Sequence, residues 1–241
     1  MCCLFLAASS TVAIAQTNVV DLVNPIIGTN GMGHTFPGAC VPFGLVQLSP
    51  DTDTIPHNVD GKYQPRSYEY CAGYQHKDSS IVGFSHTHFS GTGHSDLGDI
   101  LIMPTTGTLK LNPGTATNPD GGYRSRFSHD TEISRPGYYE VMLADYGVKA
   151  QLTTTQRVGI HKYTYPTNSE NQRVILDMIH GIYNYDGKVL WTNIRVENDT
   201  LVTGYRITNG WARTNYTYFA MSFSKPITHY GCEEKAKVNY R

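Results

Sequence analysis

The sequence predicts an all-β fold, an antiparallel β-sandwich with long loops at one end. After residue 80, runs rich in Val, Ile, Thr, Tyr and Phe alternate with short turn sequences such as Asp186-Gly187 and Asn209-Gly210. These side chains suit the pleated, half-buried surface of a sheet, and no stretch shows the period of an amphipathic helix. Because short connections join consecutive strands, the sheets are expected to be antiparallel.

The expected strands follow one another along the second two thirds of the chain. Alternation of apolar and polar residues is cleanest at residues 148–156, where Val148, Ala150 and Leu152 fall on one face of the expected strand. Residues 24–80 are dense in Gly, Pro, Asn, Asp and Tyr and have little strand pattern, so packed loops are expected there. We expect strands at residues 81–90, 100–103, 138–143, 148–156, 160–165, 173–179, 189–196, 201–208 and 216–224.

The first sixteen residues differ from the rest of the chain. They contain no charged side chain, and apolar stretches precede the small-residue sequence Ala13-Ile14-Ala15. This pattern predicts a signal peptide over residues 1–15, a mature domain over residues 16–241, and a periplasmic or secreted protein. A buried first strand or helix is the alternative. No later segment is apolar for long enough to span a membrane, and the cysteines that remain (Cys40, Cys71 and Cys232) allow at most one disulfide.

Charge and motifs exclude several classes of function. The 241-residue chain has 19 basic and 20 acidic side chains, a net charge of −1, which gives no electrostatic basis for nucleic-acid binding. The glycine-rich stretch at residues 28–39 is no dinucleotide loop, because Pro37 and Pro42 prevent the helix that must follow. It is no phosphate loop either, because no Gly-Lys-Ser/Thr sequence follows it. Glu69 is the only Glu in the Gly- and His-rich loops, so no pair of glycosidase carboxylates is evident.

The strongest candidate for chemistry is residues 76–99, which hold His76, His86, His88 and His94 of the ten histidines. If residues 81–90 form one strand, His86 and His88 point to the same face. Such a pair could be half of a metal site completed by His94 or Asp96. It could equally bind sugar hydroxyls as neutral donors and acceptors, or consist of core histidines bonded to adjoining loops. The residues alone leave all three interpretations open.

Tyrosines are frequent in the same region. Aromatic faces stack on sugar rings, and a phenol adds a hydrogen bond, although most tyrosines of strand-rich proteins serve packing. The tyrosines concerned are Tyr63, Tyr68, Tyr70 and Tyr74.

Long stretches of the chain resemble the N-terminal domain of glycoside hydrolase family 92. The first two are VNPIIGTNGMGHTFPGACVPFGLVQLSPDT and YEYCAGYQHKDSSIVGFSHTHFSGTGHSDLGDILIMP. The later stretches SRPGYYEVMLADYGVKAQLTTTQRVGIHKYTYP and GWARTNYTYFAMSFSKP are similar to the same domain. The resemblance covers residues 19–226.

The resemblance implies an exported, calcium-dependent exo-α-mannosidase that trims mannose from glycans with inversion. Such enzymes have a supersandwich-like N-terminal domain followed by an (α/α)6 barrel, with the active site between them. The general acid, the base and most calcium ligands belong to the barrel. We therefore expect no catalytic residue and no metal ligand in these 241 residues, and no activity from the chain alone. The expected partners are a mannose-containing glycan and the (α/α)6 domain.

The resemblance also implies a substrate-binding role for the loops of this domain. We expect the loop bases to be packed and the tips exposed, with His34, Phe36 and His88 reachable by solvent. A stand-alone carbohydrate-binding β-sandwich is the alternative, and a His-x-His metalloenzyme is a third hypothesis. The residues assigned to substrate binding are Gly28, His34, Phe36, Cys71, Tyr74, His86, His88 and Asp96.

Overall fold

The computed structural model describes residues 18–233 except 54 and 95, so the predicted signal peptide lies outside the described residues. This part contains four short 3-10 helices, η1 (Val19–Leu22), η2 (Pro65–Tyr70), η3 (Pro119–Gly121) and η4 (His129–Thr131). No helix of the described residues is long and apolar enough to cross a membrane. The strands are β1 (Ala39–Cys40), β2 (Gln47–Asp51), β3 (Asn58–Val59), β4 (Lys62–Tyr63), β5 (Ser80–Ile81), β6 (Gly83–Ser85), β7 (Leu101–Thr105), β8 (Ser125–Arg126), β9 (Ile133–Arg135), β10 (Tyr138–Leu143), β11 (Val148–Thr154), β12 (Gly159–Thr164), β13 (Arg173–Asp177), β14 (Val189–Val196), β15 (Leu201–Thr208) and β16 (Asn215–Ser222).

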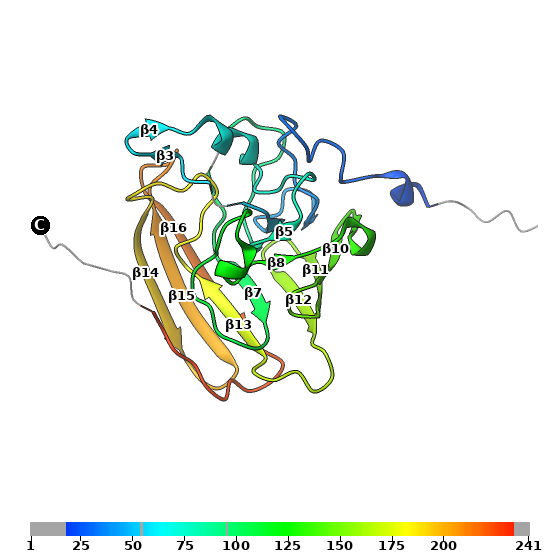
Figure 1. Ribbon diagram of the computed structural model, residues 1–241, viewed down its shortest axis with the longest axis vertical. Helices are drawn as coiled ribbons and strands as arrows, with labels where there is room; N and C mark the ends of the chain where they lie inside the picture. Colours follow the sequence, from blue (N-terminus) through cyan, green and yellow to red (C-terminus); the bar gives the residue numbers. More distant parts are fainter. Residues whose placement is uncertain (1–17, 54, 95, 234–241) are drawn as a thin grey trace, which may run out of the picture.

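The strands form three larger sheets. A five-stranded sheet has the order β1-β2-β6-β7-β13, a four-stranded sheet the order β12-β11-β10-β9, and a three-stranded sheet the order β14-β15-β16. The pairs β3–β4 and β5–β8 form two-stranded sheets. Figure 1 shows β7 and β13 between β14–β16 on one side and β10–β12 on the other. The strand pairings are antiparallel, as the short connections predicted.

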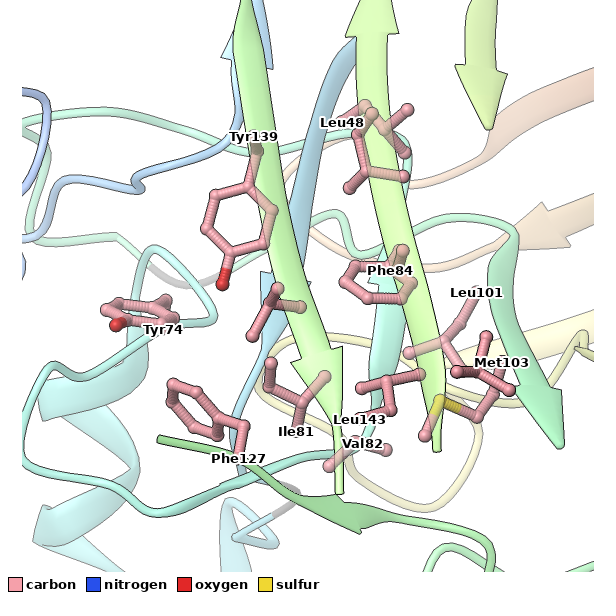
Figure 2. Packing of buried hydrophobic residues seen from close by; sticks show 14 of the residues in the cluster. Leu48, Tyr74, Ile81, Val82, Phe84, Leu101, Met103, Phe127, Tyr139 and Leu143 are labelled. Atoms are coloured by element: carbon pink, nitrogen blue, oxygen red, sulfur yellow. The ribbon is translucent and has the colours of Figure 1, made fainter. Parts of the chain in front are cut away.

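The core lies between the five-stranded and four-stranded sheets. β11 alternates between buried and half-buried side chains, and Val148, Ala150 and Leu152 are fully buried, as their period predicted. β10 pairs with β11 so that Leu143 lies opposite Val148. Figure 2 shows Leu143 with Leu101 from β7 inside this layer. Each such side chain contributes about 1.5–3 kcal/mol through burial, which fixes the two sheets against each other.

The expected strand at residues 81–90 is wrong as a single element. β5 pairs with β8, whereas β6 pairs with β2 and β7 and ends at Ser85. Beyond it, the His88 N–H donates to the side-chain oxygen of Gln47 (3.2 Å) instead of to a strand carbonyl. The alternation of a strand therefore stops at Ser85, and it does not place His86 and His88 on one face.

The sequence analysis also missed β2, which crosses the loop-rich stretch at residues 24–80. This strand lies inside the five-stranded sheet, between β1 and β6. Its buried residues include Ser49, Pro50 and Asp51. Polar side chains and a proline are untypical of a strand inside a sheet, so these residues do not show the apolar pattern that predicts a buried strand. Much of the rest of the stretch forms loops, as expected, and it also contains the short strands β1, β3 and β4 and the helix η2, which were not predicted.

Candidate functional site

The loops at the end of the sandwich are tied into one packed unit. The Gln75 carboxamide accepts from the Gly31 N–H (2.8 Å) and donates to the Gly31 carbonyl (2.9 Å). The Gly91 N–H donates to the His34 carbonyl (2.6 Å). Gly33 packs so closely that a Cβ atom there would lie 2.1 Å from the Gly28 carbonyl oxygen. The glycine-rich stretch therefore folds tightly against the His-rich stretch.

His86 belongs to a chain of neutral hydrogen bonds that points into the sandwich. Its Nδ1 lies 2.7 Å from the Ile100 carbonyl, which only accepts, so Nδ1 carries the proton. Its Nε2 then accepts from His161 Nε2 (3.0 Å), and His161 Nδ1 accepts from the Tyr163 hydroxyl (2.7 Å). Burial lowers the pKa of His86 to about 4 and lowers the pKa of His161 well below its usual range. Both rings are thus uncharged, with both nitrogens bonded.

His88 lies in a different environment, an ionic cluster with Asp51 and His180. Its Nδ1 lies 2.8 Å from the Gln47 carbonyl and its Nε2 2.8 Å from Asp51 Oδ1. Both partners are acceptors, so both nitrogens carry protons and the ring is an imidazolium. His180 Nε2 lies 2.8 Å from Asp51 Oδ2. Burial raises the pKa of the Asp51 carboxyl, but the two imidazoles outweigh it and hold this pKa below its usual range.

These bonds decide how the His-x-His pair is used. His86 points toward β12, where it meets His161, whereas His88 points toward the face of β2 that carries Asp51. The two rings have no hydrogen-bond partner in common, and each has both nitrogens engaged. The hypothesis of a metal half-site on one strand face is therefore wrong for this pair. The geometry matches the third interpretation, histidines bonded to the adjoining loops.

The expected exposure of the loop residues is also wrong. His34, Phe36 and His88 are 6%, 9% and 4% exposed. The edge of the His34 ring packs on Tyr68 (centroids 4.9 Å apart), and the Phe36 ring packs on His88 (5.3 Å). Each of the three rings therefore packs against another ring instead of facing solvent. They support the loops from beneath and do not form the tips.

Two further predicted site residues are buried, and two lie nearer the surface. The Cys71 thiol donates to the Tyr68 carbonyl (3.0 Å), and no disulfide joins the cysteines of the described part. The Tyr74 hydroxyl donates to Glu132 (2.9 Å). Gly28 and Asp96 are half-buried. Of the eight predicted site residues, Gly28, His86 and Asp96 are therefore half-buried, and the other five are buried.

Asp96 anchors an aromatic edge that the sequence analysis missed. Its Oδ2 accepts from the Trp211 N–H (3.0 Å), and its Oδ1 lies 3.1 Å from Lys188 Nζ. Burial raises the pKa of Asp96, but Lys188 and the backbone donors outweigh it and lower this pKa. Trp211 is 69% exposed and meets the His94 ring edge-on (centroids 4.2 Å apart). A tryptophan directly after the turn Asn209-Gly210 was the available signal.

A second buried ion pair ties these loops to the three-stranded sheet. Arg206 Nε on β15 lies 2.9 Å from Asp99 Oδ1, and both side chains are buried. The Thr87 hydroxyl donates to the other oxygen of Asp99 (2.7 Å). The loop that carries His86 and His88 is thus held by two buried ion pairs, His88–Asp51 and Asp99–Arg206. These pairs fix the loop beneath the exposed aromatic edge at Trp211.

Comparisons with known proteins place the chain in a family. The family described as the glycosyl hydrolase family 92 N-terminal domain matches residues 22–240. The chain belongs to this family. A GH92 α-mannosidase from Bacteroides thetaiotaomicron, solved with and without mannoimidazole, is 45% identical to the GH92 domain described here. Its complex superposes with a TM-score of 0.78 over 87% of this chain and 26% of the enzyme.

Two other relatives are more distant. A protein from Arthroderma benhamiae named an uncharacterized secreted glycosidase is 28% identical over 71% of this chain and 20% of its own length. The GH92 glycosyl hydrolase CcMan5 is 25% identical, with a TM-score of 0.65 over 84% of this chain and 26% of its own. The GH92 domain thus spans about a quarter of the solved enzymes it resembles.

The calcium that the family resemblance implies does not fit the side chains of this domain. Calcium takes about six to eight oxygen ligands. Within the described residues, the one group of three or more His, Cys, Asp or Glu side chains close enough to hold a metal consists of His76, His129 and Glu132. Two imidazoles and one carboxylate are a poor calcium site, so we assign the ion no role here.

Proposed function

We propose that this chain is the N-terminal domain of a periplasmic or secreted α-mannosidase that hydrolyses mannosidic bonds of glycans with inversion. The observation that carries the proposal is the 45% identity, over 87% of the chain, to an enzyme whose structure is described as an α-mannosidase. Export is supported by the predicted signal peptide and by a relative named as secreted. The partners in this proposal are a mannose-containing glycan and an (α/α)6 catalytic domain.

In this proposal the GH92 domain forms one wall of the substrate pocket. The indole of Trp211 offers an exposed face for stacking on a sugar ring. The Asp96 carboxylate and the His94 ring lie beside it and supply hydrogen bonds to sugar hydroxyls. The buried members of the predicted site, Cys71 and His88 among them, act by holding the loop backbone in place. Their contribution is therefore to binding and orientation.

The chemistry itself is assigned outside these residues. Inversion requires one carboxylic acid that protonates the leaving oxygen and one carboxylate that activates water on the opposite face. Glu69 and Glu132 are both committed, the first to Lys77 and the second to tyrosines. The proposal places the acid, the base and the calcium ligands in the catalytic domain, where calcium would add electrostatic stabilisation of the distorted sugar.

Exposed apolar side chains support the presence of a covering domain. Met32, Phe43, Tyr63 and Tyr68 all lie on the loops at residues 28–43 and 63–96 and are exposed. We propose that these side chains form an apolar patch, which is typical of interfaces. Domains of one chain bury roughly 600–1,500 Å² between them, so we propose that the catalytic domain packs on this end of the sandwich.

A chimera tests the proposal. The chain replaces the corresponding quarter of the Bacteroides thetaiotaomicron α-mannosidase, and hydrolysis of an aryl α-mannoside is followed with calcium present. We expect turnover from the chimera and none from either part alone. A folded chimera that binds calcium but hydrolyses no mannoside would contradict the proposal.

The exposed Trp211 favours one alternative, a carbohydrate-binding module that works without catalysis. Titration of the isolated chain with an α-mannan oligosaccharide separates the two functions. Tight binding by the isolated chain, abolished by Trp211→Ala, would support the module. No binding together with an active chimera would support the enzyme domain.

A further inference from the structure

A group of three side chains outside the loop site has the composition of a metal centre. His76 precedes β5, His129 begins η4, and Glu132 follows η4. One ligand atom from each lies within 4.8 Å of the others. The centroids of the two imidazole rings are 4.0 Å apart, and His129 Nδ1 lies 2.6 Å from Glu132 Oε2. We propose that His76, His129 and Glu132 bind a divalent transition-metal ion, for which zinc is the best match.

His76 shows the first sign of an absent partner. Its Nδ1 is buried and has no hydrogen-bond partner among the described residues. An unpaired buried polar atom costs about 1–3 kcal/mol, and such atoms are rare in native proteins. The backbone of His76 is fixed, because its N–H donates to the Thr29 carbonyl (2.8 Å). A metal ion bound to the imidazole would remove this cost without moving the chain.

Glu132 supplies a carboxylate that is already oriented. Its side chain is 3% exposed, and it accepts from the Tyr139 hydroxyl (2.6 Å) and the Tyr74 hydroxyl (2.9 Å). Figure 2 shows both tyrosines at the border of the core. Burial and the neighbouring carboxylate raise the pKa of both phenols, so they remain donors. Hydrogen bonds of this kind hold metal-ligating carboxylates in place and tune the bound ion.

The ligand set decides the class of metal. Two imidazole nitrogens and one carboxylate oxygen suit zinc and its first-row neighbours and do not suit calcium or magnesium. The His129 side chain is 37% exposed, so an ion can enter from solvent and keep water as a further ligand. The phenols leave Glu132 without a strong cationic partner, since its one ion pair among the described residues is with His129. A divalent ion would provide that charge.

The site joins two parts of the fold. His76 follows Gln75, which clamps Gly31, whereas Glu132 leads into β9 of the four-stranded sheet. A bound ion would therefore fasten the glycine-rich loop region to the four-stranded sheet, with which this loop region forms no strand pairing among the described residues. This role is structural and separate from the proposed pocket wall. It also replaces the expectation that the chain contains no metal ligand.

The test uses the full chain after removal of metal with a chelator. Zinc chloride is titrated by calorimetry, and cobalt chloride is titrated while visible absorption is recorded. We expect one equivalent of zinc, a higher thermal midpoint in its presence, and a cobalt spectrum of a low-coordinate site. His76→Ala and Glu132→Gln are expected to weaken zinc binding by more than about tenfold. His229→Ala, a change at an exposed histidine outside the cluster, should leave binding unchanged.

Two further measurements separate metal binding from other effects. His129→Ala alters the exposed ligand and is expected to fold, so its loss of binding is independent of core damage. Calcium chloride should neither raise the thermal midpoint nor compete with zinc. Absence of stoichiometric zinc and of a cobalt spectrum in the unaltered chain would overturn the proposal, as would unchanged binding in folded His76→Ala and His129→Ala. None of these readouts depends on mannosidase activity.

Discussion

His88 and Asp51 form a fully buried ion pair beneath the loop end of the sandwich, with Nε2 of the imidazolium 2.8 Å from Oδ1 of the carboxylate. Desolvating two charges is costly, and removal of one partner leaves the other uncompensated. The second oxygen of Asp51 faces His180, which lies just after β13. This carboxylate therefore connects a loop, a central strand and the chain that leaves the far edge of the same sheet.

Asp51→Asn is expected to lower the free energy of unfolding by about 3–5 kcal/mol, because it leaves the His88 imidazolium buried without its counter-charge. Urea unfolding at neutral pH measures the change. Asp120→Asn is the control, since Asp120 pairs with Arg126 at the surface and its loss should have little effect. Equal unfolding midpoints for the two variants would show that the buried pair contributes nothing.

The neutral His86–His161 pair predicts a loss of stability on acidification. The folded pKa of His86 is lowered to about 4, whereas that of an unfolded histidine is about 6.5. Between these two pH values His86 is protonated in the unfolded chain but not in the folded chain. Stability is therefore full above about pH 6.5 and falls as the pH approaches 4, by roughly 3 kcal/mol for His86 alone. The free energy of unfolding from pH 7.5 to 4.5 measures this slope.

His86→Gln removes one of the titrating groups and should flatten that slope. His229→Gln alters an exposed histidine and should leave it unchanged. A slope that persists in full in His86→Gln would assign the pH dependence to other groups.

Trp211→Ala is expected to weaken sugar binding without loss of stability. The indole is 69% exposed, and one aromatic contact is worth about 0.5–1.5 kcal/mol, which corresponds to about a twofold to tenfold rise in KM. Kinetics of the chimera with an aryl α-mannoside measure the effect. Tyr218→Ala, on the open face of the three-stranded sheet, is the matched control. Similar KM values for Trp211→Ala and the parent would remove Trp211 from the pocket wall.

Gly33→Ala should disrupt the glycine-rich loop. The added Cβ would lie 2.1 Å from the Gly28 carbonyl oxygen, so the loop backbone must move. Overpacking of this kind costs about 1–3 kcal/mol, read as a lower thermal midpoint. Gly31→Ala is the control: it has φ +60° and open space around the new Cβ, so it carries only the smaller cost of a left-handed alanine. A larger loss for Gly31→Ala would contradict this account.

Alternation predicted the regular part of the fold well. The strands β10, β14 and β15 were expected with the bounds that the structure has, because their periods and turns are local signals. β2 was not predicted because its buried Asp51 is stabilised by His88 and His180, which lie far along the chain and outside any local sequence window. The prediction that His86 and His88 share one strand face was wrong because the strand ends at Ser85. Beyond it, the His88 N–H donates to the Gln47 side chain and not to a neighbouring strand.

The site was less predictable than the fold. The resemblance could not show which loop side chains turn inward, since that depends on contacts with residues far along the chain, such as those of His88 with Gln47 and Asp51. Trp211 and Asp96 meet through a bond between residues 115 positions apart. His76 joins Glu132 in the same way, by tertiary folding alone. Sequence spacing carries no information about such contacts.

The bond between Asp51 and His180 spans 129 residues of chain. During synthesis, the ribosome releases Asp51 long before His180, so the carboxylate must wait in solvent until β13 and the residues after it have emerged. Contacts of such long range make folding slow. The loop end should therefore be the last part of this chain to mature, and a nascent chain stalled before residue 180 should expose it to proteases while its β10–β11 hairpin already resists them.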